Sequence, residues 1–176
     1  MNKTPIMKKG LPILFLTLFL SPTFLSGQIS MRQAGLRLGY TSGIFYQVSS
    51  EHGNAEIAYN LMLSFKRDGI QLTGLKMVYE TSLDRISPDL FFSWGYGGHI
   101  GYAYTDHIKF MGEEYYFPGD RFCPLFGADG WLSAEYRVHE IPLNISLNYK
   151  PFVEMTIPSF LRVVPWDFAV SISYVF

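Results

Sequence analysis

Acidic and basic side chains recur on the polar side of several alternating segments, and they are the residues whose types could do chemistry. They are Arg37, Glu56, Lys76, Glu80, His99, Glu135, Arg137, Lys150 and Glu154. If these side chains lined the interior of the protein, they would form an ion path or a proton relay. They would equally serve as paired charges that fill a narrow interior, because an unpaired buried charge is expensive.

We favour the structural interpretation, because side chains usually fill the interior of a small barrel. The expected lumen charge network consists of Arg37, Glu56, Lys76, Glu135, Arg137 and Lys150. We expect its bases to pair with its acids, which places Arg37, Lys76 and Lys150 beside Glu56 and Glu135.

An enzyme that modifies lipid would need a serine or histidine beside an acid near the outer rim. Asp106, His107 and Ser159 are candidates by topology only. His99, which lies among glycines, is more typical of a hydrogen-bonded structural histidine than of a catalyst, since no positioned partner is evident. No known enzyme motif is present, so we expect no catalytic residue and no cofactor.

The longest irregular stretch, 105–124, is rich in acids and aromatic residues. The residues expected to make contacts there are Asp106, His107, Glu113, Glu114, Tyr115, Tyr116 and Phe117. The acids lack the spacing of a calcium-binding loop, so we expect no metal site. The aromatic side chains favour an adhesive patch or packing on the rim of a barrel, and both interpretations stay open.

The elements that must position these residues are strands, and the clearest is the last one, 166–176. Its large residues Trp166, Phe168, Val170, Ile172, Tyr174 and Phe176 share one parity, and small or polar residues share the other. This is period-2 alternation over the length of a membrane-spanning strand, about 9–11 residues.

Similar alternation predicts further strands, which are 34–40, 44–49, 55–66, 70–81, 90–104, 125–138 and 143–155. The alternation slips once, at Gly74, which favours a β-bulge there. If 41–43 is a turn the count is eight, and if it is not the count is seven. We prefer eight, because bacterial single-chain barrels have even strand numbers. The sequence therefore predicts an all-β, eight-stranded antiparallel up-and-down transmembrane β-barrel.

Alternation alone does not say which face meets water, so a soluble periplasmic barrel that binds an apolar ligand is the alternative. Three features favour a membrane barrel. The apolar face carries very large residues, although eight strands leave a narrow interior. The polar face carries charges of both signs. Charged residues make up only 16% of the chain, too few to coat a soluble exterior.

Residues 1–27 have the three-part plan of a secretory signal peptide: a basic start, an apolar core at 11–20 and a small residue, Gly27, before the expected cleavage. Met7 would open a shorter version of the same signal. The barrel is expected over 28–176, with a formal net charge of −4, because the leader carries three lysines and no acid. This charge argues against a nucleic-acid partner. The single cysteine, Cys123, cannot form an internal disulfide.

Several blocks of the chain, among them G-L-R-L-G-Y, W-G-Y-G-G-H-I-G-Y and D-F-A-V-S-I-S-Y-V-F, resemble those of small outer-membrane β-barrel proteins of Gram-negative bacteria. In architecture these are OmpA/OmpX-type eight-stranded barrels. The aromatic end, Tyr174 and Phe176, is similar to the terminal strand that the barrel-assembly machinery reads. The resemblance implies outer-membrane lipid, that machinery and periplasmic chaperones as partners. It implies a non-enzymatic barrel that displays chiefly the 105–124 loop for adhesion, envelope stability or partner binding, with a lipid-modifying enzyme as the alternative.

Overall fold

The computed structural model describes residues 30–52, 55–66, 69–80, 87, 89–110, 113–138, 140–156 and 160–176. The expected signal peptide, with its cleavage near Gly27, lies outside these residues. The described strands are β1 (Ser30–Gly39), β2 (Ser42–His52), β3 (Ala55–Lys66), β4 (Gly69–Glu80), β5 (Leu90–Phe110), β6 (Glu113–Arg137), β7 (Leu143–Tyr149), β8 (Phe152–Thr156), β9 (Phe160–Val164) and β10 (Phe168–Val175).

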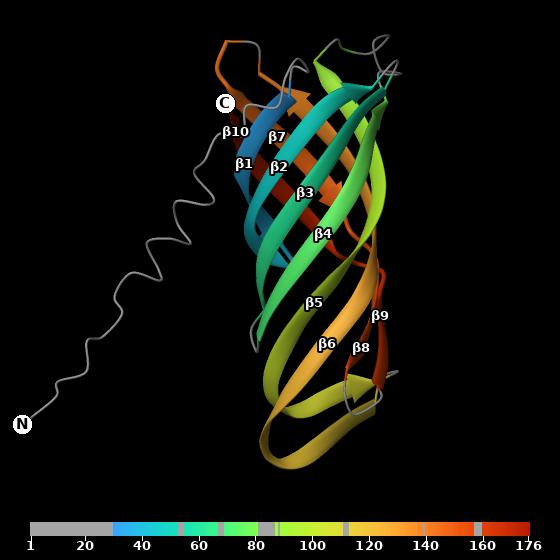
Figure 1. Ribbon diagram of the computed structural model, residues 1–176. Helices are drawn as coiled ribbons and strands as arrows, with labels where there is room; N and C mark the ends of the chain where they lie inside the picture. The colour runs from blue at the N-terminus through green and yellow to red at the C-terminus, as the bar shows by residue number, and fades with distance from the viewer. Residues whose placement is uncertain are drawn as a thin grey trace, which may run out of the picture.

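The strands form one antiparallel sheet that closes on itself (Figure 1). Its order is β5-β4-β3-β2-β1-β10-β7-β6-β8-β9, and the additional pairing of β5 with β6 closes the ring. The short breaks at 150–151 and 165–167 divide two long passes of the chain into β7 with β8 and β9 with β10. Each broken pass counts once, so the prediction of an eight-stranded barrel is confirmed. The hairpin of β1 and β2 also confirms that the chain turns here, although the turn lies at 40–41 and not at the predicted 41–43.

The two faces of the wall differ in polarity in the way that the last strand predicted. In β10, Phe168, Val170, Ile172 and Tyr174 are exposed, while Ala169, Ser171 and Ser173 are buried in the lumen. Exposed leucine, isoleucine, phenylalanine, tyrosine and tryptophan side chains recur around the described wall, and most buried side chains are polar or charged. A soluble barrel has the opposite arrangement. The burial pattern therefore contradicts the soluble alternative.

The prediction of a β-bulge at Gly74 is wrong. Strand β4 pairs without a register break to β3 and β5, with Gly74 opposite Leu61 on one side and Gly98 on the other. Leu75, Met77 and Tyr79 consequently point into the lumen, where they are buried. The expectation failed because it required every large apolar residue to face outward, whereas the middle of this lumen is itself partly apolar.

The 105–124 stretch is not an irregular loop. β5 and β6 continue through it as a paired hairpin, from Leu90 opposite Tyr136 to Phe110 opposite Glu113, with one irregularity between Thr105 and His107. The stretch 156–165, which separates the predicted strands 143–155 and 166–176, also contains a strand, β9, which pairs with β8. Figure 1 shows β5, β6, β8 and β9 continuing well beyond the ends of β1 to β4. We call this four-stranded part the extension.

Among the described residues, no helix has the length and apolar character needed to cross a bilayer.

Two glycines on neighbouring strands, Gly74 on β4 and Gly97 on β5, test this register. An ideal Cβ at Gly97 would meet the carbonyl oxygen of Gly74, whereas a Cβ on Gly74 would have nothing within 4 Å. We expect Gly97→Ala to lower the free energy of unfolding by about 1–3 kcal/mol, because the backbone must shift. We expect Gly74→Ala to change it by less than about 0.5 kcal/mol. Urea titration of the refolded variants measures both, and equal costs would contradict the continuous register.

Candidate functional site

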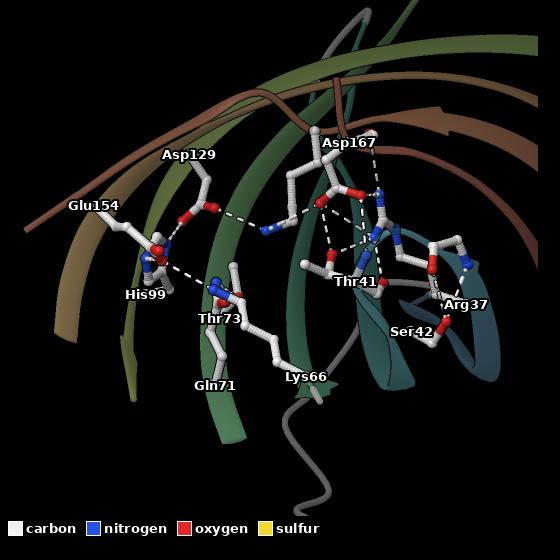
Figure 2. Close-up of polar contacts among 12 residues, drawn as sticks. Arg37, Thr41, Ser42, Lys66, Gln71, Thr73, His99, Asp129, Glu154 and Asp167 are labelled. Carbon is white, nitrogen blue, oxygen red and sulfur yellow. Dashed lines mark hydrogen bonds and ion pairs between the residues drawn. The ribbon is translucent and has the colours of Figure 1, made fainter. Parts of the chain in front are cut away.

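A buried ion pair between Arg37 and Asp167 anchors the polar part of the lumen. Arg37 points inward from β1, and Asp167 lies in the break before β10. Arg37 Nη2 lies 3.0 Å from Asp167 Oδ1, and both side chains are fully buried. Thr41, at the β1–β2 turn, accepts from Arg37 Nη1 at 2.5 Å and donates to Asp167 Oδ2 at 2.6 Å. Figure 2 shows the three side chains converging. Most polar groups of these three residues are therefore hydrogen-bonded or ion-paired within the group.

Lys150 connects this pair to a second buried acid, Asp129. Its Nζ lies 3.6 Å from Asp167 Oδ2 and donates to Asp129 Oδ1 at 2.9 Å. Asp129 Oδ2 in turn lies 2.8 Å from His99 Nδ1. Lys150 occupies the break between β7 and β8, so both strand breaks place a charged residue in the lumen.

Glu154, on β8, continues the chain of charges towards the extension. Its Oε2 accepts from Lys66 Nζ at 2.9 Å, and its Oε1 accepts from Arg162 Nη1 at 3.3 Å. His99 Nε2 lies 3.5 Å from the same carboxylate. The contacts are thus unbroken among Arg37, Lys66, His99, Asp129, Lys150, Glu154, Arg162 and Asp167. We call these eight residues the distal cluster, because they lie away from the chain termini.

One aromatic ring packs inside the distal cluster. Phe152 is buried, and His99 meets its ring edge-on at a centroid distance of 5.4 Å. The ammonium groups of Lys66 and Lys150 lie 5.0 Å and 4.6 Å from the centre of the same ring. Cations are attracted to an aromatic face, more strongly when water is excluded. Phe152 therefore fills space between the charges without leaving them in a purely apolar environment.

A second group of polar residues lies near the end of the barrel that holds the chain termini. Arg137 pairs with Glu135 at 2.9 Å and with Glu56 at 3.2 Å. Tyr79 donates to Glu135 at 3.0 Å and accepts from Gln47 at 2.9 Å. We call Gln47, Glu56, Tyr79, Glu135 and Arg137 the proximal cluster.

A partly apolar layer separates the two clusters. Along β4 the inward residues Leu75 and Met77 lie between Thr73 and the proximal Tyr79, and all of them are buried. Along β6, Trp131 lies between the distal Asp129 and the proximal Glu135. Leu75, Met77 and Trp131 belong to one hydrophobic cluster. Side chains therefore fill the described lumen in three layers, two charged and one largely apolar.

The structure places five of the six residues of the predicted lumen network in the lumen, but in two separate groups and with different partners. Glu56, Glu135 and Arg137 meet as a group. Arg37 and Lys150 pair instead with Asp167 and Asp129, so their predicted pairing with Glu56 and Glu135 is wrong.

Lys76 is exposed on the outer face of β4, so its predicted place in the lumen is wrong. The bulge assigned to Gly74 had reversed the two faces of this segment. The predicted network omitted three lumen residues, Asp129, Asp167 and Lys66. Each lies on the polar parity of its segment, and this parity could have identified them as lumen residues. Arg162 lies on β9, between the predicted strands 143–155 and 166–176.

Other predicted residues are placed only in part. Tyr174 and Phe176 are exposed on the outer face, with their rings 6.5 Å apart. The side chains of the 105–118 segment lie outside what the structure describes. They include Asp106, His107, Glu113, Glu114, Tyr115, Tyr116 and Phe117. Ser159 also lies outside the described residues.

The distal cluster is a network of paired charges, and the contacts of His99 belong to it. Both ring nitrogens of His99 face carboxylates, at 2.8 Å and 3.5 Å. Among the described residues, no group of three or more His, Cys, Asp or Glu side chains could hold a metal ion.

Comparison with known proteins gives one distant structural likeness. No protein-family description matches the chain, and no curated protein does. Among solved structures, the N-terminal β-barrel domain of OprF from Pseudomonas aeruginosa is similar at 10% identity and a TM-score of 0.48. The likeness covers 86% of this chain and 100% of that domain. At this level it assigns neither a family nor an activity.

Removing Asp167 tests whether the distal cluster depends on charge pairing. Asp167→Ala leaves Arg37 and Lys150 short of a carboxylate, so we expect it to lower the free energy of unfolding by about 3–5 kcal/mol. In the double variant Arg37→Met, Asp167→Leu no charge of this pair remains, and we expect a smaller loss. Urea titration of the three proteins measures the difference. A double variant less stable than Asp167→Ala would contradict the pairing argument.

Proposed function

We propose that this protein is a non-enzymatic integral outer-membrane β-barrel with a closed lumen that displays its extension outside the cell. In this proposal a leader ending near Gly27 directs export, and the barrel-assembly machinery inserts the barrel through its last strand. The end with the chain termini faces the periplasm. The extension then serves adhesion, envelope stability or the binding of a surface partner.

The polarity of the wall supports membrane insertion. Lumen side chains are mostly charged or polar and are paired with one another, while the outer face is apolar. A strand of 12 residues such as β3, tilted by about 45°, rises about 28 Å, close to the apolar band of about 25 Å on such barrels. Aromatic residues lie near both strand ends, with Tyr136 and Tyr174 towards the termini and Tyr40 and Tyr102 at the other end.

The filled lumen supports a closed barrel rather than a pore. Three layers follow one another along the described interior: the distal cluster, the layer around Trp131 and the proximal cluster. The charged side chains of the two clusters form ion pairs with one another. An ion that entered would have to break such pairs. This is the observation that carries the proposal of a displayed, non-conducting barrel.

The extension supports display. Phe122 is exposed on β6 at the base of the extension, and its ring stacks at 5.4 Å on that of Tyr102, which lies on β5 beside the start of β4. Exposed aromatic residues favour protein interfaces. A rigid paired hairpin also presents its tip with less loss of entropy on binding than a free loop would.

Shortening the β5–β6 hairpin tests display separately from folding. Tyr104 and Phe122 are direct partners, so an Asn-Gly turn can join them in place of 105–121. We expect the shortened protein to remain in the outer-membrane fraction and to shift on a gel after boiling. We expect adhesion of cells, or their resistance to detergent, to fall to the level of a deletion strain.

Either of two results would contradict the proposal. A shortened protein that restores the deletion strain fully would show that the hairpin is not displayed for function. Altered lipid A acylation in the deletion strain would instead favour the alternative of a lipid-modifying enzyme.

A charge placed on each face of β10 tests membrane insertion. Ile172, mid-strand, is exposed on the outer face, so Ile172→Arg should cost about 2–4 kcal/mol in lipid vesicles. Ser171 is buried in the lumen, so Ser171→Arg should fail by crowding instead. Urea titration in vesicles and in detergent separates the causes, because only the Ile172→Arg cost should depend on the bilayer. A harmless Ile172→Arg would show that the outer face does not meet hydrocarbon.

A further inference from the structure

Lys76 is a cation on an otherwise apolar part of the outer wall. It is exposed on β4, between its cross-strand partners Tyr59 on β3 and Tyr96 on β5, which are 60% and 63% exposed. None of the described side chains forms an ion pair with it. The nearest acid on the same face of β4 is Glu80, which accepts a hydrogen bond from Trp94 Nε1 at 2.8 Å.

The position of Lys76 along the strand is costly in a membrane. Lys76 lies four residues before Glu80, the last residue of β4. For a strand tilted by about 45°, this places Lys76 about 9 Å above the rim of the barrel, measured along the barrel axis. Glu80 is thus about 13 Å away along the strand, too far to pair. A lysine on the lipid face is unfavourable unless its long side chain reaches polar groups. The polar groups nearest to Lys76 are those at the membrane surface on the side of the chain termini.

An apolar groove begins beside Lys76 and runs along the wall. Its first part, of about 420 Å³, is lined by Tyr59 and Gly74 together with Tyr46, Val48 and Leu61. Its second part, of about 580 Å³, shares Tyr46 and Leu61 and continues over Leu36, Ile44, Leu63 and Leu72. The two parts together form an apolar channel on the outside of β1 to β4, with the tyrosine and the lysine at its start.

We propose that this wall holds one anionic phospholipid of the periplasmic leaflet. The Lys76 ammonium, reaching towards the rim, binds the phosphate with help from the Tyr59 hydroxyl, and one acyl chain occupies the groove. The proposal rests on the proposed function, since it requires the barrel to span a membrane with its termini on the periplasmic side.

Charge favours a lipid over a second copy of the chain. Two copies in one membrane are related by an axis along the membrane normal, so a shared face places equivalent residues at equal height. Lys76 would then approach Lys76 of the other copy, and Glu80, the nearest acid on this face of β4, lies too far along the strand to compensate. A phosphate supplies the missing negative charge and the acyl chain supplies the apolar volume.

Electron spin resonance of spin-labelled lipids tests the site in phosphatidylcholine vesicles that hold the full-length mature barrel. We expect the immobilised fraction of labelled phosphatidylglycerol to exceed that of labelled phosphatidylcholine by about fivefold, the effect of one basic residue near an anionic headgroup. Lys76→Gln should abolish this preference, and Lys76→Arg should retain it.

A second pair of variants tests the groove without changing charge. Gly74→Phe should fill the groove and reduce the immobilised fraction of both lipids, because a side chain at Gly74 has open space outward. Ala128→Phe is the matched control, since Ala128 is exposed on β6 away from the groove. It should leave the immobilised fractions unchanged.

The outcomes separate this proposal from the proposed function. Boiling-dependent gel shifts first establish that each protein has inserted, and failure of the wild type to insert would overturn the proposed function itself. An inserted wild type without headgroup preference, or a preference that Lys76→Gln retains, would overturn the lipid site alone. A dimer in chemical cross-linking that Gly74→Phe removes and Ala128→Phe retains would assign this face to a second copy instead.

Discussion

The narrow interior of an eight-stranded barrel is the constraint on which the rest of this structure depends. Such an interior has room for side chains only, so each inward group must be paired or packed against a neighbour. Arg37, Asp167 and Lys150 meet the constraint by pairing fully buried charges. Leu75, Met77 and Trp131 meet it by packing. The inward glycines beside them, such as Gly127 under the His99 ring, leave the space that the larger side chains occupy.

The breaks in the wall follow from the same constraint. Lys150 and Asp167 lie at the two points where a long pass of the chain leaves its strand, between β7 and β8 and before β10. At these points the backbone still pairs, since Lys150 N donates to Asp167 O at 2.8 Å. Each break therefore serves as the place where a long or charged side chain enters the lumen.

Much of the fold was predictable because alternation reports directly which side chains share a face. The last strand was predicted correctly from its parity, and the β1–β2 hairpin from the even strand number of bacterial barrels. Gly74 shows where this reasoning fails. Parity identifies two faces but not which one is the lumen, and the apolar Leu75 and Met77 looked like residues of the outer face. The partners of Arg37 were equally inaccessible, because the register of the closing strands, which brings Asp167 to it, depends on the whole ring.

The closing pair of strands, β1 with β10, also sets the order in which the barrel can form. Neighbours such as β3 and β4 join residues close in sequence, but the seam joins Gln33 to Val175, nearly the full length of the described chain. Contacts of such large sequence separation form slowly. The wall cannot close until the final residues have been synthesised, and β1 carries an unpaired edge until then. An unpaired edge is a template for aggregation. The nascent chain therefore carries this exposed edge for as long as its last strand is missing.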